Sequence, residues 1–264
     1  LKTYNMMPED LEKKITSKTK AVIFVDALGN PSNIHEISAI CKKHNISLIE
    51  DAACALGSSE YGIKNGNIAD LTCFSFHPRK LLTTGEGGAV TTNNPSYADE
   101  IEVKLNHGAI FKEGKFQFIT SGYNYRMTEM QAIMGIEGLK KLDKNIEIRN
   151  IIKSKYTEAL SELGFTPQWI NNNSFHNIQS VTFTVPSKIN RDGLIQYLKT
   201  KGIESTIGTY CLSNTSYYKL KYNNIQPNSK FLEENTITLP CYKGVNTKKV
   251  IKTISKYVPT EVSI

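Results

Sequence analysis

The sequence lacks a long hydrophobic run: the longest, AVIFVDAL, is interrupted by Asp26. A helix that crosses a bilayer needs about 20 consecutive apolar residues, so we expect no membrane span. The N-terminus also lacks a basic segment followed by an apolar one, so we expect no secretion signal. These two absences argue against a membrane protein.

Cysteine is scarce and unpatterned. The chain has five cysteines, which form no CxxC pair: Cys41, Cys54, Cys73, Cys211 and Cys241. An odd number without metal-ligand spacing predicts neither a disulfide framework nor a zinc site, and we expect no metal. Reduced thiols are typical of a cytoplasmic protein.

Arginine is rare among the basic residues, because only four of the 32 lysines and arginines are arginine. The net charge of +7 is spread along the chain without the clustered arginines and aromatic residues of a nucleic-acid surface. We therefore expect no nucleic-acid partner. A mild positive field still favours an anionic small molecule.

The first third of the chain has the pattern of a parallel α/β unit. KAVIFVDA (20–27) is an apolar run, the segment 34–44 has helical spacing after a predicted N-cap at Asn33, and SLIEDAA (47–53) forms a second buried strand. Parallel sheets place their ligands at the carboxyl ends of their strands. Asp51 occupies such an end.

A third strand, LTCFSF (71–76), leads into a proline turn that carries Lys80 and then into a glycine cluster, after which GAVTT resumes as a strand. Asp51, Ser75 and Lys80 are therefore expected at one rim of one sheet. Pyridoxal phosphate requires a lysine, a carboxylate at its ring nitrogen and hydroxyls around its phosphate, which these three residues could supply. The residues alone leave open that Lys80 is a solvated surface lysine and that Asp51 is a turn or cap residue.

The remaining pattern predicts two helices and a second, smaller domain. Met127, Met130, Met134 and Leu142 mark an amphipathic helix over 127–142, and another runs from about Ile146 to Leu163 with Gly164 as its stop. SVTFTV (180–185) alternates like a half-exposed antiparallel strand, 191–202 is a short helix, 203–207 a short strand and 246–258 a terminal amphipathic helix. WINNNSF and YNNIQPNS are expected to be surface loops.

Several motifs in this order strongly resemble the DegT/StrS family of sugar-nucleotide aminotransferases: VIFVDALGNPSNIHEI, LIEDAACALGS, DLTCFSFHPRKLLTTGEGGAVTT, LNHG, GYNYRMTEMQAIMGIEGLKKLD and TLPCYKG. The resemblance implies an aspartate-aminotransferase-like (type I) α/β fold. It divides the chain into a partial, mostly parallel pyridoxal-phosphate-binding large domain (1–145) and a small C-terminal α/β domain (146–264).

The resemblance also implies roles for individual residues. Lys80 falls at the family's Schiff-base lysine, Asp51 at the carboxylate that faces the pyridine nitrogen, and Ser75 at a hydroxyl that holds the cofactor phosphate. Asn124 matches an asparagine that reaches the cofactor phosphate of the neighbouring subunit, which implies a homodimer with shared sites. Cys54 stands where the family often has a glutamine at the ring hydroxyl, and a thiol cannot reproduce an amide's hydrogen bonds.

The implied function is transfer of an amino group from an amino acid, glutamate in most of the family, to a nucleotide-linked keto-deoxysugar for amino-sugar and cell-surface polysaccharide synthesis. The sequence names neither the sugar nor the carbon that is aminated. The chain opens at a segment that resembles the middle of the family's large domain and has no initiator methionine, so we expect it to be part of a longer protein.

Three alternatives remain open. Related sugar dehydratases replace the Schiff-base lysine with histidine, so Lys80 favours transfer. A catalytically silent partner or regulatory protein could keep the fold, and an unrelated nucleotide-binding α/β module could share the opening strand, helix and strand. His77, Glu86 and His107 lie inside the motifs, and we expect structural roles for them.

Overall fold

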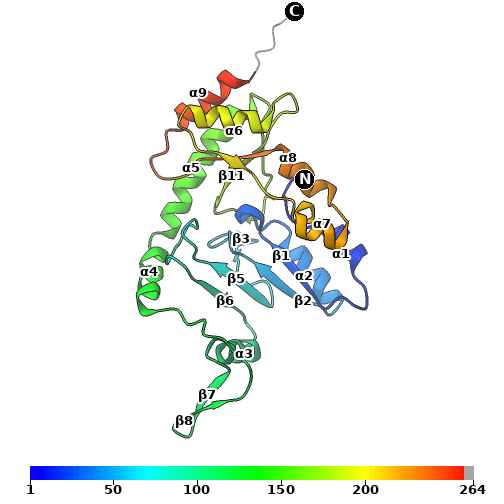
Figure 1. The fold of residues 1–264 in the computed structure, drawn as a ribbon, viewed down its shortest axis with the longest axis vertical. Coiled ribbons are helices and arrows are strands. Elements are labelled where there is room, and N and C mark those ends of the chain that lie inside the picture. The colour runs from blue at the N-terminus through cyan, green and yellow to red at the C-terminus, as the bar shows by residue number, and fades with distance from the viewer. Residues whose placement is uncertain (259–264) are drawn as a thin grey trace, which may run out of the picture. The chain divides into compact units, whose positions relative to one another are not determined.

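The computed structural model describes residues 1–258 (Figure 1), which form two compact units. One unit comprises residues 6–143 together with 173–176, and contains every site residue predicted above. The other comprises residues 1–5, 144–172 and 177 onward. We call them the sheet unit and the C-terminal unit.

A four-stranded sheet forms the centre of the sheet unit. Its order is β1-β2-β5-β6, with β1 parallel to β2, β2 parallel to β5, and β6 antiparallel to β5. The strands are β1 (Ala21–Val25), β2 (Ser47–Asp51), β5 (Leu71–Ser75) and β6 (Gly88–Thr91). The mostly parallel sheet expected from the sequence is confirmed, and its mixed edge comes from the short return through the Lys80 loop.

Helix α2 (Ile34–Lys43) packs on β1 and β2 and closes the core of this unit. Its buried side chains Ile34 and Ile37 meet Phe24 and Leu48 of the strands. Since Phe24 and both isoleucines are fully buried, each contributes roughly 1.5–3 kcal/mol of apolar burial. This packing fixes the crossover that brings β1 and β2 side by side.

The remaining elements of the sheet unit surround the sheet or extend from it. In Figure 1 the hairpin of β7 and β8, two of these remaining elements, projects beyond helix α3, away from the sheet. These elements are α1 (Pro8–Lys14), the 3-10 helix η1 (Ala27–Gly29), β3 (Ser59–Glu60), β4 (Ile63–Lys64), α3 (Pro95–Leu105), β7 (Ala109–Lys112), β8 (Lys115–Phe118), α4 (Glu129–Leu139) and β10 (Ser174–Phe175). β10 pairs with β3 in a small three-stranded sheet.

The C-terminal unit is built on a second sheet, of order β12-β13-β11-β9. Its core joins fully buried side chains of this sheet, such as Phe183 and Ile237, to Tyr156, Leu194 and Ile254 of the helices. The elements are β9 (Thr166–Pro167), β11 (Val181–Thr184), α6 (Arg191–Thr200), β12 (Thr206–Ile207), η2 (Leu212–Asn214), α7 (Ser216–Tyr222), α8 (Pro227–Asn235), β13 (Thr236–Leu239) and α9 (Thr247–Tyr257). The long helix α5 (Leu142–Ser161) runs from the end of the sheet unit into this one.

Several local predictions need correction. The helix expected over 127–142 is α4, which begins after the capping residue Thr128 and ends at Leu139, and Met130 and Met134 on it are exposed. SVTFTV is a buried central strand, because β13 and β9 pair with its two sides. Asn33 precedes α2 as predicted, but its side chain makes no capping hydrogen bond.

Other local predictions are confirmed. Gly164 and Gly202 follow α5 and α6 with positive φ angles of 84° and 67°, a conformation that glycine adopts without steric cost. The five cysteines are free thiols. Within residues 1–258, no helix combines the length and the apolar character needed to cross a bilayer.

Candidate active site

The carboxyl ends of three strands meet at one edge of the sheet. Val25 at the end of β1 pairs with Asp51 at the end of β2, which in turn pairs with Cys73 of β5. The N–H of Asp26 donates to the Asp51 carbonyl at 3.1 Å, which extends the pairing by one residue. Parallel strands end together, so this edge collects the polar residues that follow each strand.

Lys80 lies in the loop 76–87, which connects β5 to β6 and folds back on its own base. The Phe76 N–H donates to the Gly87 carbonyl at 2.9 Å, and the Thr84 N–H donates to the Phe76 carbonyl at 3.0 Å. At the tip, the Lys80 N–H donates to the His77 carbonyl at 2.9 Å. The loop therefore presents Lys80 at a defined place rather than on a free chain.

The Lys80 side chain turns inward. It is half-buried, and its Nζ lies 3.1 Å from Sγ of Cys54, which is also half-buried. Cys54 follows Asp51 by three residues, in the turn after β2. The structure thus brings Lys80 to the segment that carries the predicted carboxylate, which argues against a lysine whose amine extends freely into solvent.

Asp51 keeps part of its carboxylate available. Its Oδ1 accepts the Ala53 N–H at 3.1 Å, whereas its Oδ2 accepts no hydrogen bond within residues 1–258. Ser75 ends the neighbouring strand β5, and its Oγ accepts the His77 N–H at 3.3 Å. An amine, a partly free carboxylate and a hydroxyl therefore come from the ends of two adjacent strands and the loop that follows β5.

Glycines let the loop pack closely on its surroundings. A Cβ at Gly88 would lie 2.6 Å from the Phe74 carbonyl oxygen, and one at Gly138 in α4 would lie 3.1 Å from Cγ of Leu82. The Gln131 side chain of α4 also donates to the Glu86 carbonyl at 2.9 Å. Helix α4 consequently supports the loop that carries Lys80, a contact that the sequence pattern does not reveal.

Asn124 stands apart from the other predicted residues. It is exposed in the segment between β8 and α4, where it forms a single antiparallel bridge with Asn106. No hydrogen bond in the described part of the chain joins it to Asp51, Ser75 or Lys80. Its assignment to a neighbouring subunit's cofactor stays a prediction.

The other histidines and acids of the motifs have main-chain or turn roles. The ring Nδ1 of His77 accepts the Arg79 N–H at 3.2 Å, which supports the proline turn. Glu86 contributes its carbonyl, which accepts from Thr84 Oγ1 at 2.7 Å. His107 has a positive φ of 59°, and its N–H donates to the Tyr123 carbonyl at 2.8 Å.

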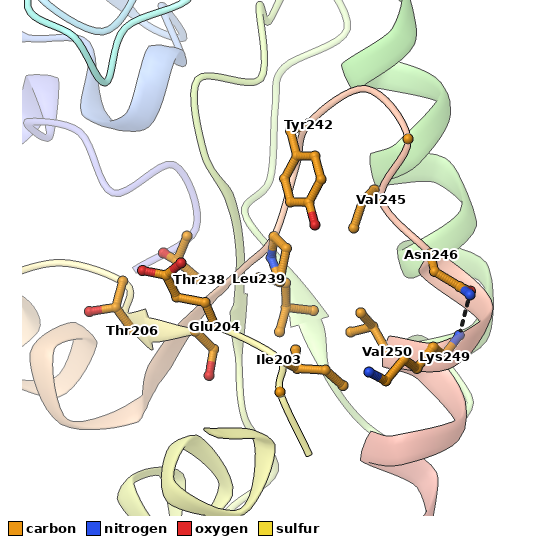
Figure 2. Close-up of a pocket in the computed structure, with 14 residues that line it drawn as sticks. Ile203, Glu204, Thr206, Thr238, Leu239, Tyr242, Val245, Asn246, Lys249 and Val250 are labelled. Carbon is orange, nitrogen blue, oxygen red and sulfur yellow. Dashed lines mark hydrogen bonds between the residues drawn. The ribbon is translucent and has the colours of Figure 1, made fainter. Parts of the chain in front are cut away.

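Two of the cavities outside this edge cluster are close to each other in volume. One, of about 560 Å³, belongs to the C-terminal unit; Figure 2 shows Tyr242, Lys249, Ile203 and Glu204 around it, and none of the predicted site residues lines it. The other, of about 470 Å³, lies in the sheet unit and is lined by residues that include Cys73, Glu86, Gly88, Tyr125, Arg126 and Gln131. Partial burial and the charge of Asp51 raise the pKa of the Cys73 thiol.

Comparison with known proteins identifies the family of this chain. Residues 1–257 match the DegT/DnrJ/EryC1/StrS aminotransferase family. The chain is a member of this family. Its fold agrees, because the PseC aminotransferase of Helicobacter pylori, involved in the biosynthesis of pseudaminic acid, superposes with a TM-score of 0.91 at 26% identity, covering 96% of this chain and 71% of PseC.

Two curated relatives show how similar the sequences are. The GDP-perosamine synthase of Vibrio cholerae is 31% identical over 255 residues, which cover 94% of this chain and 69% of the synthase. The UDP-4-amino-4,6-dideoxy-N-acetyl-beta-L-altrosamine transaminase of Campylobacter jejuni is 32% identical over 261 residues, which cover 92% of this chain and 67% of the transaminase. The chain therefore spans about two thirds of the length of these relatives.

The residues at the edge fit the aminotransferase cofactor. Pyridoxal phosphate needs an amine for its aldehyde and a carboxylate for its ring nitrogen, and Lys80 and Asp51 offer both from neighbouring elements. The free Oδ2 of Asp51 is the decisive observation, because a carboxylate already saturated by protein donors could not also accept from a ring N–H.

Proposed function

We propose that the protein transfers an amino group from an amino acid, glutamate, to a keto-deoxysugar linked to a nucleotide, with pyridoxal phosphate as cofactor. The observation that carries this proposal is the half-buried Lys80, whose amine lies 3.1 Å from Sγ of Cys54, in the turn that follows Asp51. Membership of an aminotransferase family and the nucleotide-sugar names of two relatives support the substrate class.

Each residue at the edge has a separate task in this proposal. Lys80 Nζ would hold the cofactor aldehyde and, when released from it, would move a proton at the substrate α-carbon. The free oxygen of Asp51 would accept a hydrogen bond from the protonated ring nitrogen, and the Ser75 hydroxyl would bind the phosphate. Bound pyridoxal phosphate supplies the electron sink that makes the α-carbon acidic. Cys54 lies against the Lys80 amine and orients it toward the Asp51 strand.

The experiment is a comparison of Lys80→Ala with the wild-type full-length protein. We expect Lys80→Ala to lose covalent fixation of pyridoxal phosphate by borohydride, read as intact mass, and to lose amino transfer from glutamate to nucleotide-linked 4-keto sugars. The matched control is Lys199→Ala, which removes an exposed lysine of α6 and should retain both. Fixation of the cofactor to Lys80→Ala at the wild-type level would show that another lysine holds it.

We further propose that two copies of the chain pair through the sheet unit and share their sites. Large apolar side chains on the β7–β8 hairpin, the segment after it and α4 are 58% to 77% exposed: Phe111, Phe116, Phe118, Ile119, Tyr125, Met130 and Ile133. Soluble monomers rarely leave so many large apolar side chains in water. Asn124 lies in the same stretch of chain, which supports its assignment to the neighbouring copy's cofactor.

Mixing two defective variants tests the sharing. In the proposed dimer, each site combines Lys80 of one copy with Asn124 of the other. A hybrid of Lys80→Ala and Asn124→Ala therefore has one site with both substitutions and one intact site. After subunit exchange, half of the dimers are hybrids, and we expect activity of about a quarter of the wild-type level. Each variant alone serves as the control. If the mixture is no more active than the two variants measured separately, the sites are not shared.

A further inference from the structure

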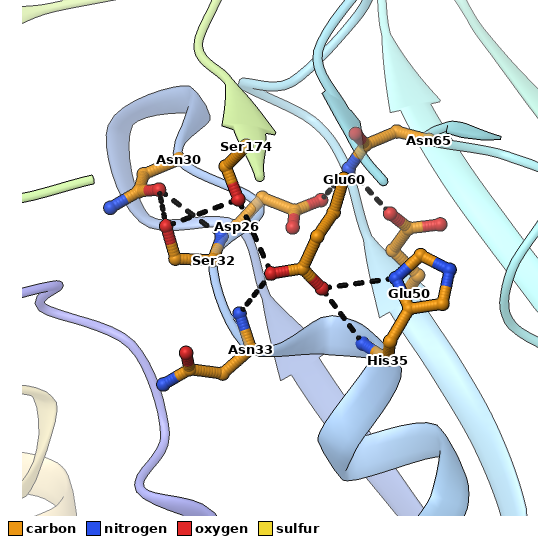
Figure 3. Close-up of polar contacts among 9 residues, drawn as sticks. All are labelled: Asp26, Asn30, Ser32, Asn33, His35, Glu50, Glu60, Asn65 and Ser174. Carbon is orange, nitrogen blue, oxygen red and sulfur yellow. Dashed lines mark hydrogen bonds and ion pairs between the residues drawn. The ribbon is translucent and has the colours of Figure 1, made fainter. Parts of the chain in front are cut away.

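Three carboxylates lie close together at the ends of β1 and β2. Asp26 follows β1 and is 1% exposed, Glu50 is fully buried in β2, and Asp51 is the next residue. In the part of the chain that the structure describes, no lysine, arginine or histidine pairs with Asp26 or Glu50. Figure 3 shows Asp26 and Glu50 on either side of Asn65. Two buried anions side by side without a cation are strongly unfavourable, so one of the two acids holds a proton.

Hydrogen bonding decides which acid is charged. Glu50 accepts three hydrogen bonds: from Asn65 Nδ2 at 2.5 Å, from the Gly66 N–H at 3.0 Å and from Thr72 Oγ1 at 2.6 Å. Asp26 accepts one, from Asn65 Nδ2 at 2.8 Å, and its buried Oδ1 has no partner. Donors stabilise a carboxylate, so the charge belongs on Glu50 and the proton on Asp26.

The electrostatic surroundings agree with the hydrogen bonds. Burial raises the pKa of Asp26 well above its ordinary value, and the charge of Glu50 raises that pKa further. The Asn65 hydrogen bond opposes this shift, and the nearby charge of Asp51 adds to it. Glu50 and Asp51, both on β2, are the charged groups that face Asp26, and Cys73 on β5 faces Asp51.

We propose that Asp26 remains a neutral carboxylic acid in the working protein and is a positioning residue for Asp51. Its main-chain N–H holds the Asp51 carbonyl at 3.1 Å, and its side chain is tied through Asn65 to Glu50, the residue before Asp51. Because Asp26 is neutral, Asp51 has one buried anion beside it, Glu50, rather than two. This inference rests on the proposed function only for the task of Asp51; the protonation of Asp26 is independent of it.

If Asp26 is protonated in the folded state, folding stability changes with pH in a direction that can be measured. An unfolded aspartate loses its proton at a pH of about 4, whereas the folded Asp26 keeps it to a higher pH. The folded state then binds more protons, so stability falls as the pH rises through the interval between the two pKa values. Asp26→Asn removes this loss. We therefore expect the melting temperature of Asp26→Asn, relative to that of the wild type, to increase between pH 5 and pH 8.

The experiment has a second arm, which distinguishes a neutral Asp26 from an ionised one. The pH midpoint of the bound-cofactor absorbance is compared among the wild type, Asp26→Asn and Glu50→Gln in the full protein. We expect Asp26→Asn to leave the midpoint in place, since it replaces one neutral group with another, and Glu50→Gln to move it, since it removes a charge. Equal movement in both variants would show that Asp26 is ionised and would overturn the proposal.

The protonated acid can also be observed directly. An infrared difference spectrum of the cofactor-free wild type minus Asp26→Asn should show a carboxylic-acid carbonyl band at neutral pH, and a carboxylate band in its place would contradict the proposal. A wild-type protein without any cofactor absorbance would refute the proposed function, yet the infrared and melting measurements would still test Asp26. The two ideas can therefore fail separately.

Discussion

Glu60 offers the strongest test of how the fold supports the site. This residue is 1% exposed, and its carboxylate accepts the N–H groups of Asn33 at 2.7 Å and His35 at 3.0 Å, at the start of α2 (Figure 3). His35 Nδ1 lies 3.0 Å from the same carboxylate, and Ser174 Oγ donates to it at 3.2 Å. Asn33 cannot cap the helix with its own side chain, because its backbone is left-handed, with φ of 81°. The distant carboxylate does so instead.

The substitution Glu60→Gln keeps the shape of the side chain and removes its charge. One of its two terminal atoms becomes an N–H₂ donor, so the half-buried N–H of Asn33 or of His35 loses its acceptor, at a cost of about 1–3 kcal/mol. Loss of the negative charge at the helix N-terminus costs a further ~0.3–2 kcal/mol. We expect a total of about 3 kcal/mol, which for a chain of this size lowers the melting temperature by roughly 6–12 °C.

Thermal unfolding followed by circular dichroism measures this loss, and hydrogen exchange of the peptide 33–44 locates it. The matched control is Glu36→Gln, which changes an exposed acid in the same first turn of α2 and should lower stability by less than about 1 kcal/mol. If Glu60→Gln melts within about 2 °C of the wild type and α2 keeps its protection, the carboxylate does not cap the helix.

Two further predictions concern packing. Gly138→Val places a side chain against Leu82, where a Cβ alone would lie 3.1 Å from Cγ of Leu82. We expect the substitution to cost about 1–3 kcal/mol of stability. It should also shift the Lys80 loop and so weaken cofactor binding, as measured by absorbance titration. Phe183→Ala empties a fully buried position in β11 and should cost about 3–5 kcal/mol in urea unfolding without changing the cofactor absorbance.

The strand ends were the most predictable part of the site. Apolar runs followed by Asp26 and Asp51 predict parallel strands, and parallel pairing places the two acids at one edge whatever the details of the crossover. The proline and glycines around Lys80 likewise predict a turn that returns to the sheet, as β6 does. These predictions were correct because the information is local to a strand or a turn.

Burial within the second sheet was less predictable. SVTFTV alternates apolar and polar residues, which indicates one solvated face. Thr182 is nevertheless buried in the structure. Its Oγ1 forms a hydrogen bond of 2.9 Å with Oγ1 of Thr238 on the neighbouring strand, which satisfies the buried hydroxyl. A threonine can satisfy its hydroxyl on a partner strand, and the sequence pattern does not say which strand that is. β13 itself, which carries Thr238, was not predicted.

The acids around Asp51 show the same limit at the site itself. Asp51 is predictable from its place after an apolar strand, but the sequence gives no sign that Glu50 is charged and Asp26 neutral. Glu50 is stabilised by donors from Asn65, Gly66 and Thr72, which lie 15 to 22 positions away and reach it only after β5 has paired with β2.

The motif therefore places the carboxylate, and the segments that fold over it decide its electrostatic surroundings. A substitution in those segments, far from Lys80 along the chain, is expected to alter the charge next to Asp51 without changing any residue of the motif.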